Sequence, residues 1–232
     1  MKILVFAPHP DDEVLGCGGT MARYIEKGAE VTVCIVTSPQ PPVYVYKDNP
    51  AEKNGWPHII YPQIKAAHEL LKIKETVFLQ FPCVLLENEP RHIVNGKISE
   101  VIQRVKPDVV FIPHFGDMQK DHTIVSEAVM VAVRPKYAHV PRFVYSYEFL
   151  SETEWNIPHV TNTFIPNTFI DITDYLPKKL DAMACFTSQV GEFPNSRSIE
   201  AVEALAKLRG STSGYKAAEA FSLIREYRGI DG

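Results

Sequence analysis

One repeated pattern constrains the fold of this chain most strongly. Short runs of mostly apolar residues alternate with stretches whose apolar residues have helical spacing. The runs at 2–7 (KILVFA), 31–37 (VTVCIVT) and 108–113 (DVVFIP) lack the regular polar alternation of a strand with one face in water. Strands that are buried on both faces read in this way, and they belong to parallel sheets. We therefore expect a mostly parallel central sheet with helices on both of its faces.

The same alternation gives the expected order of elements along the chain. We predict strands at 2–7, 31–37, 76–81, 108–113, 142–147 and 168–172, and helices at 14–28, 59–71, 93–105, 122–133, 175–185, 199–208 and 215–227. The helix at 122–133 ends at Arg134-Pro135, because proline cannot continue a helix. A length of 232 residues with 45% hydrophobic residues suits one domain, residues 1–232, of class α/β with a mixed α/β C-terminal third.

Two segments are too long to be simple connections. Residues 38–57 are rich in proline and carry Tyr44, Tyr46 and Trp56, and residues 150–166 carry Trp155. Loops of this length are usually functional or disordered. In an open α/β sheet such loops gather at the carboxyl ends of the strands, where ligands bind. We expect a wall or lid there, whose aromatic rings either pack within the lid or stack on a ligand.

A histidine and three carboxylates follow the first strand at once, in the sequence HPDDE at 9–13. Pro10 fixes its own φ and stiffens the turn, so that His9 and Asp12 can converge on one point while Asp11 projects beside them. Crowded carboxylates repel one another unless a cation lies among them. Neutral imidazole together with carboxylate suits zinc and similar divalent ions.

A second polar cluster follows the strand at 108–113. It contains His114, Asp117, Asp121 and His122, and it opens the helix at 122–133. A catalytic zinc site needs three protein ligands and one open position, so the third ligand should come from this second strand end. Spacing alone does not decide which histidine it is. Asp121 is a candidate helix cap and a candidate partner that holds a ligand histidine from behind.

The two clusters together resemble the LmbE / PIG-L family of metal-dependent N-acetylglucosamine deacetylases. The resemblance rests on PHPDDE after a first strand and on D-x-x-x-D-H about a hundred residues later, with weaker support from Ser188-Gln189 and 214–221. It implies a Rossmann-like α/β domain. It also implies that His9, Asp12 and His122 are the metal ligands and that Asp11 is the general base.

The activity implied by this resemblance is that of a hydrolase acting on a linear amide, a zinc-dependent N-deacetylase. Metal-bound water would attack the N-acetyl group of an N-acetylglucosamine-type sugar or sugar conjugate, with Asp11 taking its proton. Zinc is the expected ion, and Fe²⁺ or Co²⁺ would suit the same donors. Many relatives have a second histidine where this chain has Gln119, whose amide donates hydrogen bonds but cannot titrate. Gln119 and His114 are the candidates for oxyanion or substrate contact.

Composition excludes several other classes of partner. The net charge of -4 gives no basic surface for nucleic acid, and no apolar run reaches the roughly 18 residues of a membrane span. The run at 3–7 is short and is followed at once by polar residues, so we do not expect it to be a signal peptide. Four scattered cysteines indicate reduced thiols and a cytoplasmic protein. The expected partner is a small amino-sugar substrate, and relatives suggest a homo-oligomer.

Alternative interpretations of these features stay open at this point. HPDDE could be an acidic helix start, although that explains neither His9 nor the second cluster. The metal could serve an ester or phosphoester hydrolase, or a catalytically silent sugar-binding protein. Gly16, Gly18 and Gly19 miss the dinucleotide pattern and instead suggest a helix packed closely on the sheet. By default, Arg197 and Arg209 are expected in solvent, and His58, His68, His92 and His139 at the surface or in packing.

Overall fold

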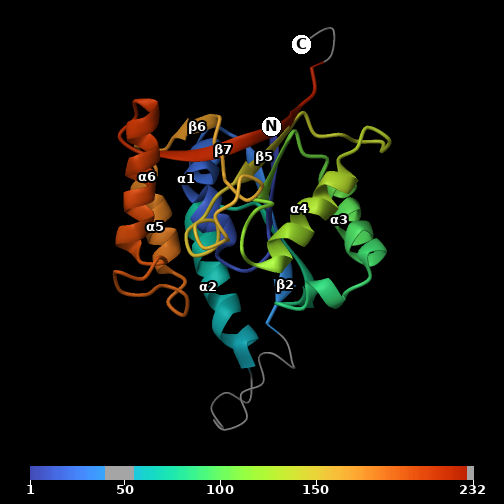
Figure 1. The fold of residues 1–232 in the computed structure, drawn as a ribbon, viewed down its shortest axis with the longest axis horizontal. Coiled ribbons are helices and arrows are strands. Elements are labelled where there is room, and N and C mark those ends of the chain that lie inside the picture. The colour runs from blue at the N-terminus through green and yellow to red at the C-terminus, as the bar shows by residue number, and fades with distance from the viewer. Residues whose placement is uncertain (40–54, 229–232) are drawn as a thin grey trace.

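A single seven-stranded sheet forms the centre of the part of the chain that the computed structural model describes, residues 1–39 and 55–228 (Figure 1). Its order is β3-β2-β1-β4-β5-β7-β6. The first five strands in this order run parallel, and β7 is antiparallel to both of its neighbours. The strands are β1 (Lys2–Ala7), β2 (Glu30–Ser38), β3 (Glu75–Pro82), β4 (Val109–Pro113), β5 (Phe143–Tyr147), β6 (Thr168–Asp171) and β7 (Ala218–Glu226). The predicted α/β class with a mostly parallel sheet is confirmed.

Helices cover both faces of this sheet. They are α1 (Asp12–Glu26), α2 (Gly55–Leu71), α3 (Arg91–Val105), α4 (Lys120–Ala132), α5 (Leu176–Ala184) and α6 (Ile199–Ser213), with a 3-10 turn at Leu86–Asn88. Figure 1 shows α1, α2, α5 and α6 on one side of the sheet and α3 and α4 on the other. Accordingly Ile3 and Val5 of β1 pack into the first core, and Leu4 and Phe6 into the second. Burial on both faces explains the apolar run at 2–7.

Glycines let α1 lie close to the sheet, as the sequence suggested. A Cβ atom at Gly16 would overlap the ring of Tyr147, and one at Gly19 would overlap the side chain of Ile172. Tyr147 is fully buried, and its hydroxyl donates to the carbonyl oxygen of Phe6 at 2.8 Å. The helix that follows the HPDDE turn is therefore fixed against β1 and β5.

The predicted helix at 215–227 is wrong, because Ala218–Glu226 forms strand β7. Its Ala, Glu, Leu and Arg residues favour a helix locally. The segment instead pairs with β5 on one side and β6 on the other, and this pairing outweighs local propensity. Ala218, Ala220 and Phe221 are buried. The last third of the chain is thus mixed α/β, with one helix fewer and one strand more than predicted.

A buried ion pair ties this last third to α1. Lys179 of α5 and Glu219 of β7 are at most 5% exposed, and their Nζ and Oε1 atoms lie 2.5 Å apart. The Lys179 ammonium also donates to the carbonyl oxygen of Leu15 at 2.6 Å. The Glu219 carboxylate accepts from the backbone N–H groups of Gly19 and Thr20, at 3.0 and 2.7 Å. Three elements far apart in the sequence are joined at this point.

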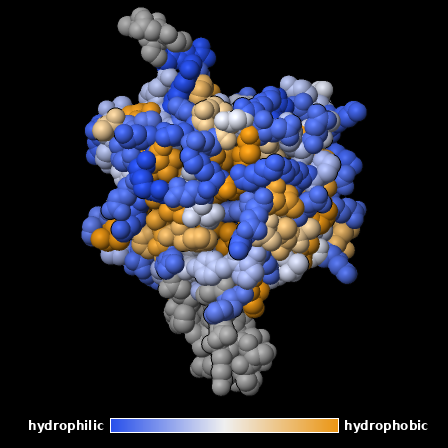
Figure 2. All heavy atoms as spheres, turned by 180° about the vertical axis from the view of Figure 1, so that it is seen from behind, coloured by the Kyte–Doolittle hydropathy of each residue, from blue (hydrophilic) through white to orange (hydrophobic). Residues whose placement is uncertain are grey.

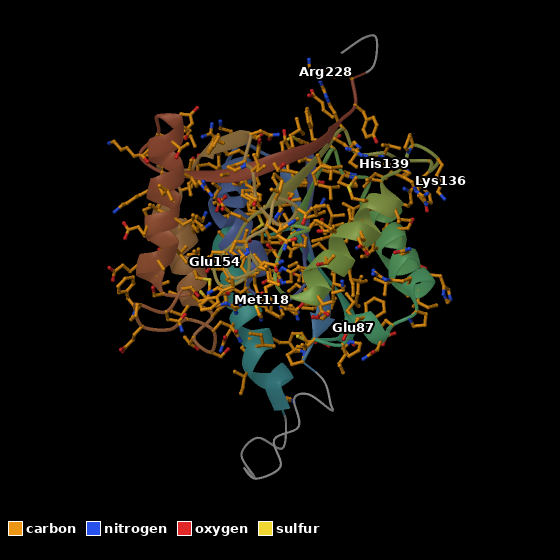
Figure 3. The ribbon with its side chains drawn as sticks, viewed as in Figure 1. Glu87, Met118, Lys136, His139, Glu154 and Arg228 are labelled. Carbon is orange, nitrogen blue, oxygen red and sulfur yellow. The ribbon has the colours of Figure 1, made fainter. Side chains whose placement is uncertain are left out.

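The carboxyl ends of the parallel strands meet at one edge of the sheet, the lower edge in Figure 1. Met118, which follows β4, lies toward this edge in Figure 3, whereas Lys136 and His139, which follow α4, lie at the opposite end. The loop at 150–166 is a series of turns with Trp155 and Ile157 exposed. Residues 40–54, which make up most of the other long segment (38–57), lie outside the described residues. The wall or lid expected at that segment therefore also falls outside them.

Polar and apolar side chains are interspersed over the rear face of the molecule (Figure 2). Among the described helices, none has both the length and the apolar character needed to cross a membrane. Among the described residues, none of Cys17, Cys34, Cys83 and Cys185 forms a disulfide; the first three are buried and Cys185 is partly buried.

Candidate active site

The two polar clusters of the sequence meet at the carboxyl edge of the sheet. His9 lies in the turn after β1, Asp12 is the first residue of α1, and His122 lies in the first turn of α4, directly beyond β4. Strands β1 and β4 are neighbours. The Nδ1 atom of His9 lies 3.3 Å from Nε2 of His122. The Oδ2 atom of Asp12 lies 3.5 Å from the first nitrogen and 3.4 Å from the second.

Each of these imidazoles is held from behind by a carboxylate. His9 Nε2 lies 3.0 Å from Asp121 Oδ2, and His122 Nδ1 lies 2.9 Å from Asp117 Oδ2. A carboxylate only accepts, so we assign the ring hydrogens to these outer nitrogens. Each ring then turns its other nitrogen, which can carry a lone pair, toward Asp12.

Three atoms, His9 Nδ1, His122 Nε2 and Asp12 Oδ2, are spaced as the ligands of a zinc ion would be. An ion bound tetrahedrally at about 2.0–2.1 Å from each ligand atom would hold those atoms about 3.3 Å apart, close to the three separations in the protein. The second oxygen of Asp12, Oδ1, is buried, and no group within residues 1–39 and 55–228 forms a hydrogen bond with it. Burial lowers the pKa of His9, but hydrogen bonds with Asp12 and Asp121 outweigh it and leave the pKa well above its usual value. The site therefore calls for a positive charge, either a proton or a cation.

A second group, His9, Cys83 and Asp121, also brings its ligand atoms within 4.8 Å of one another. Its carboxylate is already engaged, because Asp121 accepts from the backbone N–H groups of Val84 at 2.8 Å and Leu86 at 3.2 Å. Burial raises the pKa of Asp121, but its contacts with His9, Val84 and Leu86 outweigh this and lower it. The group of His9, Asp12 and His122 is thus the better donor set.

Asp121 does not cap α4, as the sequence suggested it could. The cap is Gln119, whose side-chain oxygen accepts from the backbone N–H of Asp121 at 2.5 Å. Asp121 supports His9, and the neighbouring His122 is supported by Asp117. The hydroxyl of Thr153 in turn donates to Asp117 at 2.6 Å.

Asp11 has the most unusual backbone of the site. Its φ is 98°, a left-handed conformation that non-glycine residues rarely adopt, and strain of about 1–3 kcal/mol of this kind clusters at functional sites. Its backbone N–H donates to Glu13 at 3.2 Å, and Glu13 lies 3.0 Å from Nε2 of His68. His68, expected only at the surface or in packing, is a buried support of this turn.

The Asp11 side chain is 1% exposed and makes one ion pair, between its Oδ2 and Nη1 of Arg197 at 3.1 Å. Its Oδ1 is buried and has no hydrogen-bond partner among the residues that the structure describes. Burial raises the pKa of Asp11 well above its usual value, although Arg197 opposes the shift. The carboxylate is therefore both confined and suited to exchanging a proton.

A cavity of about 420 Å³ opens beside these groups. The polar and charged residues that line it include His9, Asp11, Gln119, Glu152, Gln189 and Arg197. Burial raises the pKa of Glu152. The Nε2 atom of Gln119 lies 3.4 Å from Nε2 of His9, so the amide is at the site. His114 is not at the site. Its Nε2 contacts the carbonyl oxygen of Asn162 at 2.9 Å, and its ring meets that of Phe164 edge to face and borders a different cavity.

Sequence reasoning missed several residues of this site. Arg197 is not a solvated arginine, because its side chain is 21% exposed and bonded to Asp11. Arg209 is likewise paired, through two bonds of 2.6 Å to Glu148. Glu152 carried no signal of its own. The Ser188-Gln189 motif pointed to the segment that supplies Gln189 and Arg197, without showing what that segment contacts.

Comparison with known proteins gives a family match and similar structures. The protein-family model PIG-L, described as GlcNAc-PI de-N-acetylase, matches residues 4–133, more than half of the chain. A probable N-acetyl-alpha-D-glucosaminyl L-malate deacetylase 2 of Bacillus cereus is 35% identical over 56% of this chain and 60% of its own length.

Two solved structures show how far the fold itself is shared. The conserved protein TT1542 of Thermus thermophilus has a TM-score of 0.75 and 25% identity, covering 98% of this chain and 96% of its own. The 4-carboxy-2-hydroxymuconate hydratase GalB from a Pseudomonas species has a TM-score of 0.73 and 20% identity, covering 98% of both chains. The second likeness shows the fold alone, and a shared fold does not determine the reaction.

Proposed function

Because the chain belongs to the PIG-L family, we propose that it is a metal-dependent hydrolase that removes the N-acetyl group from an N-acetylglucosamine-type sugar or sugar conjugate. The description of the family and the name of the Bacillus cereus relative support this reaction class. The aligned region spans less than two thirds of that relative, so the substrate of the whole protein is part of the proposal.

One observation carries the proposal: two imidazoles, each held from behind by a carboxylate, converge with Asp12 on one point. We propose that His9, Asp12 and His122 hold a divalent cation there, Zn²⁺ in the first instance and Fe²⁺ or Co²⁺ as alternatives. Such an ion, when bound, supplies a Lewis acid that polarises a carbonyl oxygen and lowers the pKa of water.

Asp11 is the general base in this proposal. It borders the same cavity as His9, is nearly fully buried, and has one oxygen that no described residue bonds. That oxygen can take a proton from the attacking water. The protonated carboxyl group can then give the proton to the departing amine, which leaves as a free amino sugar beside acetate.

Gln119 is the side-chain donor that we place near the developing oxyanion or the substrate. Its amide lies at the cavity wall, and it can donate a hydrogen bond without changing protonation state. His114 contacts the carbonyl oxygen of Asn162 and not the groups of the site, so we assign it a structural role.

We further propose a cytoplasmic location, since none of the four cysteines forms a disulfide among the described residues. A homo-oligomer is the expected assembly, by analogy with relatives. The partner is a small amino-sugar compound, because the cavity of about 420 Å³ suits one or two sugar rings better than a macromolecule.

Acetate release tests this function. The metal-loaded protein would be given N-acetylglucosamine and conjugates with neutral, anionic and lipid aglycones, together with an aryl acetate ester and an aryl phosphate ester. We expect acetate from one or more of the sugars, loss of activity with a chelator, and recovery with Zn²⁺. Hydrolysis of only the esters would replace the proposed reaction, and binding of sugars without any hydrolysis would indicate a silent sugar-binding protein.

A further inference from the structure

Among the described residues, one side chain bonds the Asp11 carboxylate. Its Oδ2 is bonded to Arg197, and its Oδ1 has no hydrogen-bond partner in this part of the chain. The backbone of Asp11 is held separately, because its N–H donates to Glu13 and its carbonyl oxygen accepts from Leu15. Torsion about the side-chain bonds of Asp11 is therefore restrained mainly by the guanidinium group.

That guanidinium group is itself held on several sides. Its Nε donates to Ser151 Oγ at 2.8 Å, and its Nη1 donates to Gln189 Oε1 at 3.2 Å as well as to Asp11. Glu152 lies 4.0 Å from Nη2. Burial lowers the pKa of Arg197, but the surrounding carboxylates outweigh it and raise the pKa. The cation is fixed and stays charged.

The partners of Arg197 come from two separate loops at the rim of the cavity. Ser151 and Glu152 follow β5, in the loop whose Glu154 appears in Figure 3 between α6 and Met118. Gln189 follows α5, and Arg197 itself stands two residues before α6. Arg197 thus links both loops to the turn after β1.

From these contacts we propose that Arg197 is a positioning residue, which holds the Asp11 carboxylate in one orientation for proton transfer and does not itself grip the sugar. This inference rests on the proposed function only in that Asp11 is taken as the base. The Nε and Nη1 groups of Arg197 already donate to Ser151, Asp11 and Gln189, and its Nη2 group lies beside Glu152. A residue that positions a base affects kcat, whereas a residue that binds the substrate equally in the ground and transition states affects KM.

Arg197→Gln tests the proposal in the metal-loaded enzyme. We expect kcat for acetate release to fall about 100-fold and KM to change less than about 3-fold, because misplacing a catalytic group by 1 Å has effects of that size. Arg197→Lys, which keeps the charge, should recover part of the loss, and added guanidinium ion should raise kcat of Arg197→Ala. A raised KM at unchanged kcat would overturn the proposal.

Arg209→Gln is the matched control. Arg209 has similar exposure, 22% against 21%, and pairs with Glu148, and neither of these residues lines the cavity beside Asp11. It should keep the wild-type kcat. Equal loss of kcat in both variants would mean that removing any half-buried arginine lowers activity by loosening the loops, and would also overturn the proposal.

A thermal measurement separates this inference from the proposed function. Arg197→Gln would be made in the wild type and in Asp11→Asn, and Tm would be measured for all four metal-loaded proteins. If the two side chains are coupled, Arg197→Gln shifts Tm in the first background and much less in the second. Equal Tm shifts in both backgrounds would refute the coupling, and this result does not require the protein to release acetate. Coupled shifts in a protein that releases no acetate would support the contact between Arg197 and Asp11 and contradict the proposed reaction.

Discussion

His122 Nδ1 lies 2.9 Å from Asp117 Oδ2, and both side chains are fully enclosed by protein. This contact fixes which nitrogen of His122 carries the hydrogen and turns Nε2 toward His9 and Asp12. Carboxylates behind metal-binding histidines raise their basicity and fix their orientation.

We therefore predict that Asp117→Asn lowers zinc affinity by about 10–100-fold without unfolding the protein. Competition with a fluorescent chelator measures the affinity directly, with no need for activity. Asp171→Asn serves as a control, since Asp171 is 34% exposed and pairs with Arg23 far from the site. If the Asp117→Asn protein bound zinc as tightly as this control, Asp117 would have no role in supporting the zinc site.

The two histidines after β4 give a second prediction. His122 is buried at the centre, and His114 contacts Asn162 instead. His122→Gln should abolish stoichiometric zinc binding and acetate release, and His114→Gln should keep both. Metal content per chain, measured after gel filtration, distinguishes them. The reverse result would show that the third ligand had been wrongly assigned.

Close packing of α1 gives a third prediction. A side chain at Gly16 would collide with Tyr147, so Gly16→Ala should destabilise the fold by about 1–3 kcal/mol. Gly96 lies inside α3, and a Cβ atom there would meet nothing within 4 Å. Gly96→Ala should therefore be neutral or stabilising, by up to about 1 kcal/mol. Urea unfolding measures both, and equal effects would contradict the close approach of α1 to Tyr147.

The buried ion pair of Lys179 and Glu219 gives a fourth prediction. Lys179→Met leaves a buried carboxylate without its cation and should cost about 3–5 kcal/mol of the free energy of unfolding. The exposed pair of Lys207 and Glu203, 2.8 Å apart, is the control, and Lys207→Met should cost no more than about 0.5 kcal/mol. Similar losses in the two variants would show that the buried pair does not anchor α1.

The parallel sheet could be predicted from the sequence because burial on both faces leaves a direct mark on composition. Ile3 and Leu4 point to opposite cores, so both positions must be apolar. The strand β7 left no such mark. Its alanines and glutamate favour a helix on their own, and only pairing with β5 and β6, which lie far away in the sequence, makes the segment extended.

The candidate metal group could be predicted for a similar reason. His9 and Asp12 are neighbours through a stiff turn, and parallel strands bring their carboxyl ends to one edge, where His122 follows the neighbouring strand. Which carboxylate supports which histidine was not predictable. Asp121 and His122 are adjacent in a helix, where successive side chains point about 100° apart, so Asp121 reaches His9 and leaves His122 to Asp117.

The contact of Arg197 with Asp11 was the feature of the site that was hardest to predict from the sequence. The two residues are 186 positions apart, and neither loop that holds Arg197 has a regular pattern. A lone arginine in a loop is solvated by default, and only the folded chain shows the carboxylates that surround it.

The central claim is most directly tested by acetate release as metal is added to the metal-free protein. Our account predicts that release from the best N-acetylglucosamine conjugate rises linearly until one Zn²⁺ is bound per chain, and that Asp11→Asn binds the same single ion while releasing acetate at least about 100-fold more slowly. Acetate release by the metal-free protein, or undiminished release by Asp11→Asn, would contradict it.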